Sequence, residues 1–108
     1  MHMRRDNGDI FEAHVISELL KQGYKSDQLK YYRTKNQVEV DLIIDTVSEQ
    51  IPIEIKYSKQ LKQDHFSGLK NFYEQYKPQR SILINLADIG SMAFGEQVVE
   101  LRSCFGLI

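Results

Sequence analysis

Residues 38–45 read VEVDLIID and residues 51–57 read IPIEIKY, and these two stretches decide the fold of the chain. Each is rich in apolar residues, carries internal charge and is shorter than a typical helix, so the pair predicts two neighbouring strands. Side chains on a strand point alternately to its two faces. In the second stretch, Glu54 and Lys56 should therefore share one face, opposite three apolar or aromatic residues: Ile53, Ile55 and Tyr57.

The same alternation in the first stretch turns Glu39 and Asp41 to one face, opposite three apolar residues: Val38, Val40 and Leu42. If the two strands are adjacent, Asp41, Glu54 and Lys56 can converge on one patch. Two carboxylates that lie close together repel each other unless a cation or a proton joins them. The pattern therefore suits a divalent metal ion, with the lysine as a fixed positive charge beside it.

Composition limits the chain to one compact unit. With 108 residues and 42% hydrophobic content, it can bury one core, so residues 1–108 are expected to form a single domain. Residues 1–7 are expected to be disordered or to derive from an expression tag. The net charge of -1 argues against a general polyanion binder. The middle segment, residues 21–80, holds eleven Lys or Arg against eight Asp or Glu, so any basic surface should come from there.

Cysteine usage and hydropathy indicate the compartment. Cys104 is the single cysteine, which excludes an internal disulfide and fits a reducing environment. No apolar run approaches the roughly 20 residues that span a membrane, and the N-terminus has no signal-peptide pattern. A cytoplasmic protein without a membrane partner is expected.

A first helix is predicted from about residue 8 to residue 22, with Gly23 as its C-terminal stop. Glu12 lies at the edge of the apolar stripe of this helix and could point toward the sheet. Asp9 followed by Glu12 also fits a capping box, in which Glu12 would only satisfy a backbone N–H at the start of the helix. Spacing alone leaves both interpretations open.

The remaining elements follow in order along the chain. Strands at 29–33, 38–45 and 51–57 predict an antiparallel meander, and a helix over 64–76 then leads by a crossover to a parallel strand at 81–86. A loop at 88–95 and a last strand at 97–102 complete the chain. His65, at the start of the second helix, is expected to be a solvated or capping residue rather than a catalytic one.

Several short motifs occur together in this order: Gly8-x-x-x-Glu12, Tyr32-Arg33-x-Lys35, Glu39-Val40-Asp41 and Ile53-Glu54-Ile55-Lys56-Tyr57-Ser58. In this combination the chain resembles the PD-(D/E)XK nuclease superfamily, from about residue 8 to residue 86. More narrowly, it looks like the uncharacterised nuclease-like domain at the C-terminus of certain prokaryotic AAA-type P-loop ATPases. The resemblance implies an α/β, restriction-endonuclease-like αβββαβ core, with a mixed, mostly antiparallel sheet flanked by helices.

The resemblance also implies a role for each matching residue. Asp41 and Glu54 would bind Mg²⁺ or Mn²⁺, with the backbone carbonyl of Ile55 as a further ligand. Lys56 would orient or activate the attacking water, and Glu12 would complete the site through a water molecule. The expected activity is Mg²⁺-dependent hydrolysis of phosphodiester bonds in nucleic acid, with DNA as the expected polymer. The residues expected to contact the nucleic acid are Arg33, Lys35, Lys59 and Lys62.

Other functions stay open at this point. Because the chain has no Gly-x-x-x-x-Gly-Lys-Ser/Thr motif, it cannot itself bind nucleotide as a P-loop ATPase does. A catalytically silent interaction or regulatory domain of a P-loop ATPase is therefore an alternative, and a homodimer is another possible assembly. In the plainest alternative, Glu54 and Lys56 form only a surface ion pair, which contributes about 0–1 kcal/mol.

Overall fold

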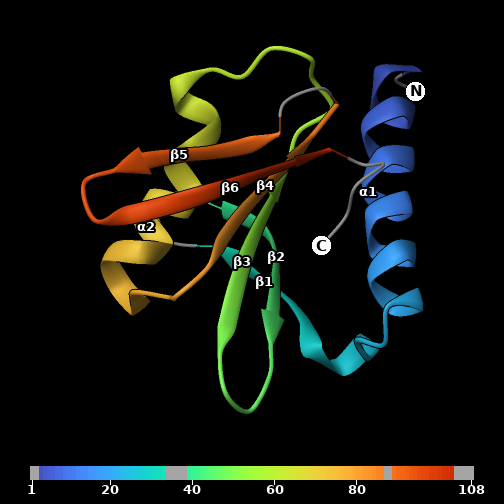
Figure 1. Cartoon of the computed structure of the whole chain (residues 1–108). Coiled ribbons are helices and arrows are strands. Elements are labelled where there is room, and N and C mark those ends of the chain that lie inside the picture. The colour runs from blue at the N-terminus through green and yellow to red at the C-terminus, as the bar shows by residue number, and fades with distance from the viewer. Residues whose placement is uncertain (1–2, 34–38, 87–88, 104–108) are drawn as a thin grey trace.

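In the computed structural model, one six-stranded mixed sheet lies between two helices (Figure 1). The structure describes residues 3–33, 39–86 and 89–103, without the side chains of residues 3–9 and 31–33. The strand order is β1-β2-β3-β4-β6-β5, so β3 and β4 lie at the centre and β1 and β5 at the edges. This arrangement confirms the predicted α/β class with a mixed sheet flanked by helices.

The elements follow each other along the chain in this order: α1 (Met3–Lys21), η1 (Ser26–Gln28), β1 (Leu29–Arg33), β2 (Glu39–Asp45), β3 (Gln50–Ile55), η2 (Gln63–Phe66), α2 (Ser67–Tyr76), β4 (Ser81–Asn85), β5 (Gly90–Phe94) and β6 (Gln97–Ser103). The pairings β1–β2 and β2–β3 are antiparallel, which confirms the predicted meander. β4 pairs in parallel with β3 and with β6, so the segment that contains η2 and α2 is the expected crossover. In the described part of the chain, no helix is long and apolar enough to cross a membrane.

The start of α1 differs from the prediction. The helix begins at Met3, not near Gly8, so residues 3–7 belong to it. These polar residues include no proline, and a glycine inside a helix weakens it by only about 1 kcal/mol without ending it. Asp9 consequently lies inside the helix. A capping box needs its first residue at the helix end, so Glu12 does not serve as the partner in such a box.

α1 covers one face of the sheet. Its apolar stripe packs against side chains of β2, β3 and β4 in a cluster of fully or almost fully buried residues. The members of this cluster are Phe11, Val15, Leu19, Leu42, Ile44, Ile51, Ile53, Ile55, Ile82 and Ile84. At the end of β3, the rings of Phe11 and Tyr57 meet edge to face, with 5.5 Å between their centroids. The first half of α1 is thereby fixed over the C-terminal end of β3.

α2 covers the opposite face of the sheet, over a second buried cluster made of Val40, Ile43, Phe66, Leu69, Phe72, Leu83, Val99 and Leu101. The helix predicted over 64–76 is divided into η2 and α2, and its buried face is formed by Phe66, Leu69 and Phe72. Gly68 permits an especially close approach at the first turn of α2. A Cβ atom at this position would overlap the backbone carbonyl oxygen of Glu39, at the start of β2.

A β-bulge breaks the predicted alternation in β2. Val40 belongs to the cluster under α2, whereas Leu42 belongs to the cluster under α1, so the two side chains do not share a face. The register between β1 and β2 shifts between Lys30 and Tyr32, which accounts for this change, because an extra residue on one strand reverses the alternation beyond it. Asp41 lies between Val40 and Leu42, at this irregularity.

The segment predicted as a loop at 88–95 contains β5. This strand pairs antiparallel with β6 through a two-residue turn formed by Gly95 and Glu96. Gly95 has a φ of 63°, which suits the first position of a tight hairpin turn. The prediction failed because the segment has almost no apolar alternation, and its burial pattern confirms that it is mostly exposed.

An ion cluster links Arg80, the residue before β4, to two residues of β6. Arg80 donates two hydrogen bonds to the carboxylate of Glu100, of 2.8 Å from Nε and 2.9 Å from Nη2. Arg102 donates a third, of 2.7 Å, to the same carboxylate. These bonds hold the pKa of Glu100 down at about 2, with the Arg80 hydrogen bond as the main cause.

A substitution at Gly68 tests whether stability depends on the close approach of α2 to β2. We expect Gly68→Ala to destabilise the protein by about 1–3 kcal/mol, because the added methyl group meets rigid backbone at Glu39. The midpoint of urea unfolding measures the change. Gln75→Ala, at an exposed position of the same helix, is the control and should change stability by less than about 0.5 kcal/mol. An unchanged midpoint for Gly68→Ala would show that α2 does not need this approach.

Candidate active site

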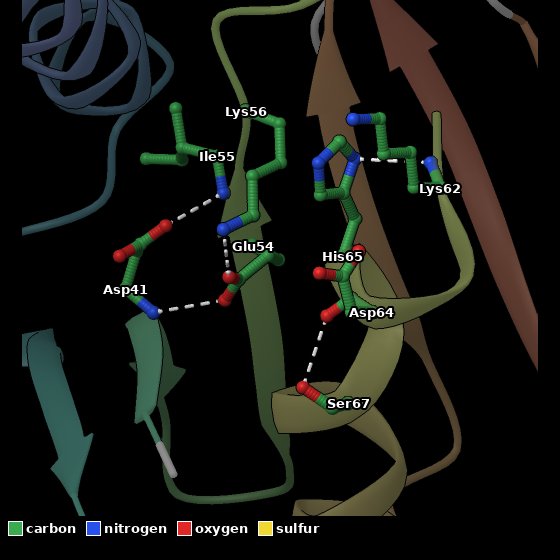
Figure 2. Close-up of polar contacts among 8 residues, drawn as sticks. All are labelled: Asp41, Glu54, Ile55, Lys56, Lys62, Asp64, His65 and Ser67. Atoms are coloured by element: carbon green, nitrogen blue, oxygen red, sulfur yellow. Dashed lines mark hydrogen bonds and ion pairs between the residues drawn. The ribbon is translucent and has the colours of Figure 1, made fainter. Parts of the chain in front are cut away.

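The site lies where β2 and β3 stop pairing through their backbones. The ladder between them runs from Asp45–Gln50 to Leu42–Ile53 and ends there. One residue further on, two side-chain carboxylates replace backbone carbonyls as acceptors for the backbone N–H groups of the facing strand. The backbone N–H of Asp41 donates to Glu54 Oε1 at 3.3 Å, and the backbone N–H of Ile55 donates to Asp41 Oδ2 at 2.9 Å (Figure 2). Each acid is therefore oriented by the backbone of the opposite strand.

Lys56 adds a positive charge to this pair. Its Nζ lies 3.0 Å from Glu54 Oε2, so the lysine and the carboxylate form an ion pair across one face of β3. The backbone N–H of Lys56 donates to the carbonyl oxygen of Ile84 at 2.9 Å, which continues the pairing of β3 with β4 beyond Ile55. The lysine is thus held by the centre of the sheet while its ammonium group reaches the acids. The predicted convergence of Asp41, Glu54 and Lys56 is observed.

Burial makes the carboxylate pair hard to ionise. Glu54 is only 6% exposed. Burial, followed by the negative charge of Asp41, raises the pKa of Glu54 to about 7, against the opposing effect of Lys56. Burial also raises the pKa of Asp41, although the hydrogen bond from Ile55 and the charge of Lys56 partly offset it. One ammonium group does not compensate a buried and a half-buried carboxylate, so the site has room for further positive charge.

Glu12 lies on α1, whose first half covers the end of β3. It is half-buried, and its neighbour Phe11 contacts Tyr57, one residue beyond Lys56. In the described part of the chain, no three His, Cys, Asp or Glu side chains come together in a group able to hold a metal ion. The structure therefore brings together two of the three predicted acids, and Glu12 stays on the helix that covers the end of β3.

The predicted nucleic-acid contacts occupy less defined positions. Arg33 ends β1, where its backbone is opposite Glu39, but its side chain is outside the described residues. Lys35 also lies outside the described residues. Lys59 and Lys62 are exposed on the segment that leaves β3 and leads to η2. That segment passes the Lys56 side of the carboxylate pair (Figure 2).

His65 is the neighbour of the site that sequence reasoning did not place there. It lies on η2, and its Nδ1 accepts a hydrogen bond of 3.2 Å from the backbone N–H of Lys62, which confirms the expected capping role. The charge of Lys56 also acts on the imidazole, so the ring lies near the site. No local spacing signals this proximity, because it depends on how the crossover folds back over β3.

A family model described as a domain of unknown function, DUF4143, matches residues 7–103. The chain belongs to this family. The match spans every strand of the sheet and almost all of α1, so the carboxylate pair, Lys56 and η2 all lie within it. Neither a curated protein nor a solved structure matches the chain.

The donor set of this DUF4143 domain fits a hard divalent cation. Mg²⁺ is usually held by one or two carboxylates, retains several waters and accepts phosphate oxygens as further ligands. Asp41 and Glu54 supply the carboxylates, and a cation between them would offset both the burial of charge and the repulsion that raise the pKa of Glu54. The carbonyl of Ile55 as a further ligand stays a prediction.

A hollow in the described part of the DUF4143 domain lies away from the acid pair. A cavity of about 450 Å³ lies between the β2–β3 turn and the end of α2, with walls formed by residues 45–50 and 76–79. These residues are at the opposite end of β2 and β3 from Asp41 and Glu54. We place the site at the acid pair rather than in this cavity, because the paired carboxylates and the lysine, and not a hollow alone, provide chemistry.

Glu54 makes the stability of the metal-free domain depend on pH in a defined direction. Its pKa rises from an ordinary 4.5 to about 7 on folding, so between these values the folded protein holds a proton that the unfolded chain has released. The contribution of Glu54 is complete below the lower value and is lost as the pH rises through the higher one. We expect Glu54→Gln, which cannot ionise, to be close to the parent at about pH 4.5 and to exceed its stability by about 3 kcal/mol at about pH 8.

Urea unfolding in EDTA across this range measures the effect. Glu74→Gln is the matched control, since it removes a carboxyl group at an exposed position of α2. Its stability should follow that of the parent at each pH. Parallel curves for Glu54→Gln and the parent would contradict the assignment of the raised pKa to Glu54.

Proposed function

We propose that this domain hydrolyses phosphodiester bonds in nucleic acid, with DNA as the expected substrate, in a reaction that depends on Mg²⁺ or Mn²⁺. The observation that carries the proposal is the reciprocal pair of Asp41 and Glu54, with Lys56 Nζ 3.0 Å from Glu54. A pair of carboxylates with raised pKa values beside a fixed ammonium group suits a cation site that also receives a phosphate. The resemblance of the motifs to the PD-(D/E)XK superfamily supports the same function.

Each residue has a role that its position supports. Asp41 and Glu54 would hold the cation, which supplies charge stabilisation at the phosphorus and activates water for attack in line. The ion pair of Lys56 with Glu54 would weaken when the cation binds. Lys56 would then orient the attacking water or stabilise charge on the phosphate. Ile55 keeps Asp41 in place through its N–H, at 2.9 Å. Glu12, from α1, would act on the site through a water molecule.

Metal binding provides the first test, without any assumption about the substrate. A cation that binds only the folded protein stabilises it by about 1.4 kcal/mol at ten times its dissociation constant. We expect Mg²⁺ and Mn²⁺ to raise the Tm of the parent by about 5 °C at that concentration. The shift should increase as the pH rises from about 6 to about 8, because the cation competes with the proton on Glu54.

Asp41→Asn and Glu54→Gln should each abolish most of this shift, while Glu74→Gln should retain it. Calorimetric titration with Mn²⁺ gives the stoichiometry directly. A shift that is the same in all four proteins would place the cation away from the carboxylate pair and would remove the main support for the proposal.

Cleavage is the second test. The parent should cleave DNA or RNA in the presence of Mg²⁺ or Mn²⁺, and Lys56→Met should lower kcat by about 100-fold or more, because it removes a charged donor from the transition state. Lys25→Met, at an exposed position beside η1, is the matched control and should leave kcat unchanged. Duplex DNA, single-stranded DNA and RNA should each be assayed, with unfolding curves to establish that the variants remain folded. Absence of cleavage of all three by the folded parent would overturn the proposal.

One observation favours a second candidate, a catalytically silent domain that binds a P-loop ATPase or another copy of itself. The ion pair of Lys56 with Glu54 already satisfies one carboxylate, and the described residues provide no group of three metal-ligating side chains. The Mn²⁺ titration separates the candidates. A silent domain should bind no cation at the acid pair, and its stability should respond to pH as the metal-free protein does.

A further inference from the structure

The start of the second helix is held firmly beside Lys56. Phe66, the last residue of η2, is almost completely buried in the cluster under α2, and its ring contacts Phe94 of β5 with 5.0 Å between centroids. His65 precedes this anchor and is half-buried. Figure 2 shows its imidazole on the side of Lys56 that faces away from Asp41, with the ring edge opposite Lys62 turned toward β3.

The capping hydrogen bond decides what His65 can do chemically. Because Nδ1 accepts the N–H of Lys62, the neutral ring must carry its proton on Nε2. Burial and the positive charge of Lys56 lower the pKa of His65, with a further contribution from Lys62 and an opposing one from Asp64. The neutral form is therefore favoured. While the cap is in place, Nε2 can donate a hydrogen bond but can neither accept a proton nor bind a metal ion.

Two donors on this side of the site have no acceptor of their own. Among the described residues, neither His65 Nε2 nor Lys62 Nζ has a hydrogen-bond or ion-pair partner. The two donors lie near each other, since the charge of Lys62, like that of Lys56, acts on the imidazole of His65. The Asp41–Glu54 side of the site is anionic and suits a cation, whereas the Lys62–His65 side presents two donors, with the exposed carboxylate of Asp64 between them in the sequence. Such a set of donors is complementary to a phosphate oxygen.

We propose that His65 and Lys62 together bind a phosphate of the nucleic-acid strand beside the Asp41–Glu54 pair, His65 through its Nε2–H and Lys62 through its charge. This inference rests on the proposed function and extends it, because it states on which side of the acid pair the strand runs. The strand would pass from the carboxylates across Lys56 to η2. His65 acts here as a positioning residue for the substrate.

A series of substitutions at His65 separates phosphate binding from simple capping. His65→Gln retains both a side-chain acceptor for Lys62 and a donor, His65→Ala removes both, and His65→Asp retains the acceptor but adds a negative charge. A purely capping role predicts that the Tm falls only for His65→Ala, because a carboxylate near a helix start is favourable. Phosphate binding predicts a different order for the affinity of nucleic acid: parent close to Gln, then Ala about fivefold weaker, then Asp more than tenfold weaker.

Affinity is measured by fluorescence anisotropy with labelled single-stranded and duplex DNA in EDTA, so that cleavage does not interfere. Lys62→Met should weaken binding about threefold or more and should reduce the slope of log affinity against log salt by about one. His14→Asp is the matched control, since it places the same charge change at an exposed position of α1. It should weaken binding by much less than His65→Asp.

The outcomes distinguish this inference from the proposed function. If the parent cleaves nucleic acid and His65→Asp has the affinity and KM of the parent, the phosphate site is overturned while the nuclease proposal stands. If affinity follows the order above but the parent does not cleave, the phosphate site is supported and the nuclease proposal falls. If the folded parent binds no nucleic acid in low salt, the phosphate site is overturned.

Discussion

The structure depends on the exchange of backbone for side-chain hydrogen bonds at the end of the β2–β3 ladder. Buried backbone N–H groups need acceptors, and here the acceptors are the carboxylates of the facing strand. Glu54 accepts from Asp41, while Asp41 accepts from Ile55. The position of each acid is therefore set by main chain on both sides. Neither carboxylate can turn away without exposing an unsatisfied N–H group in the sheet.

The layers around this point hold the arrangement in place. α1 and α2 bury the apolar faces of the sheet in two separate clusters, and Gly68 lets α2 approach the backbone just before Asp41. The acids are thus held by well-packed elements while their charge is incompletely balanced. Proteins retain unfavourable electrostatics of this kind chiefly where function requires it. The incomplete charge balance is consistent with the cation that the proposed reaction needs.

The sequence predicts the parts of the fold that depend on strict periodicity. Alternation in β3 places Ile53 and Ile55 under α1 and directs Glu54 and Lys56 to the other face, as observed. Periodicity fails where a local irregularity changes it. The bulge near Asp41 reverses the alternation in β2, so Val40 and Leu42 occupy opposite faces.

Two other differences have the same kind of cause. α1 starts at Met3 because polar residues continue a helix without an apolar signal, and β5 forms through a glycine turn although its side chains are mostly exposed. The position of His65 near Lys56 depends on the crossover and has no local signature at all. Sequence patterns thus identify the acids and the lysine, whereas the donor side of the site emerges only in three dimensions.

The Arg80–Glu100–Arg102 cluster gives the domain a second acid–base response, opposite in sign to that of the buried pair. Glu100, whose pKa is lowered to about 2, stabilises the folded state above its ordinary value of 4.5, and this contribution disappears in strong acid. Glu54 favours the folded state on the acidic side of neutrality. A bell-shaped stability profile follows for the metal-free domain, with its optimum in mildly acidic solution and a decline toward both extremes.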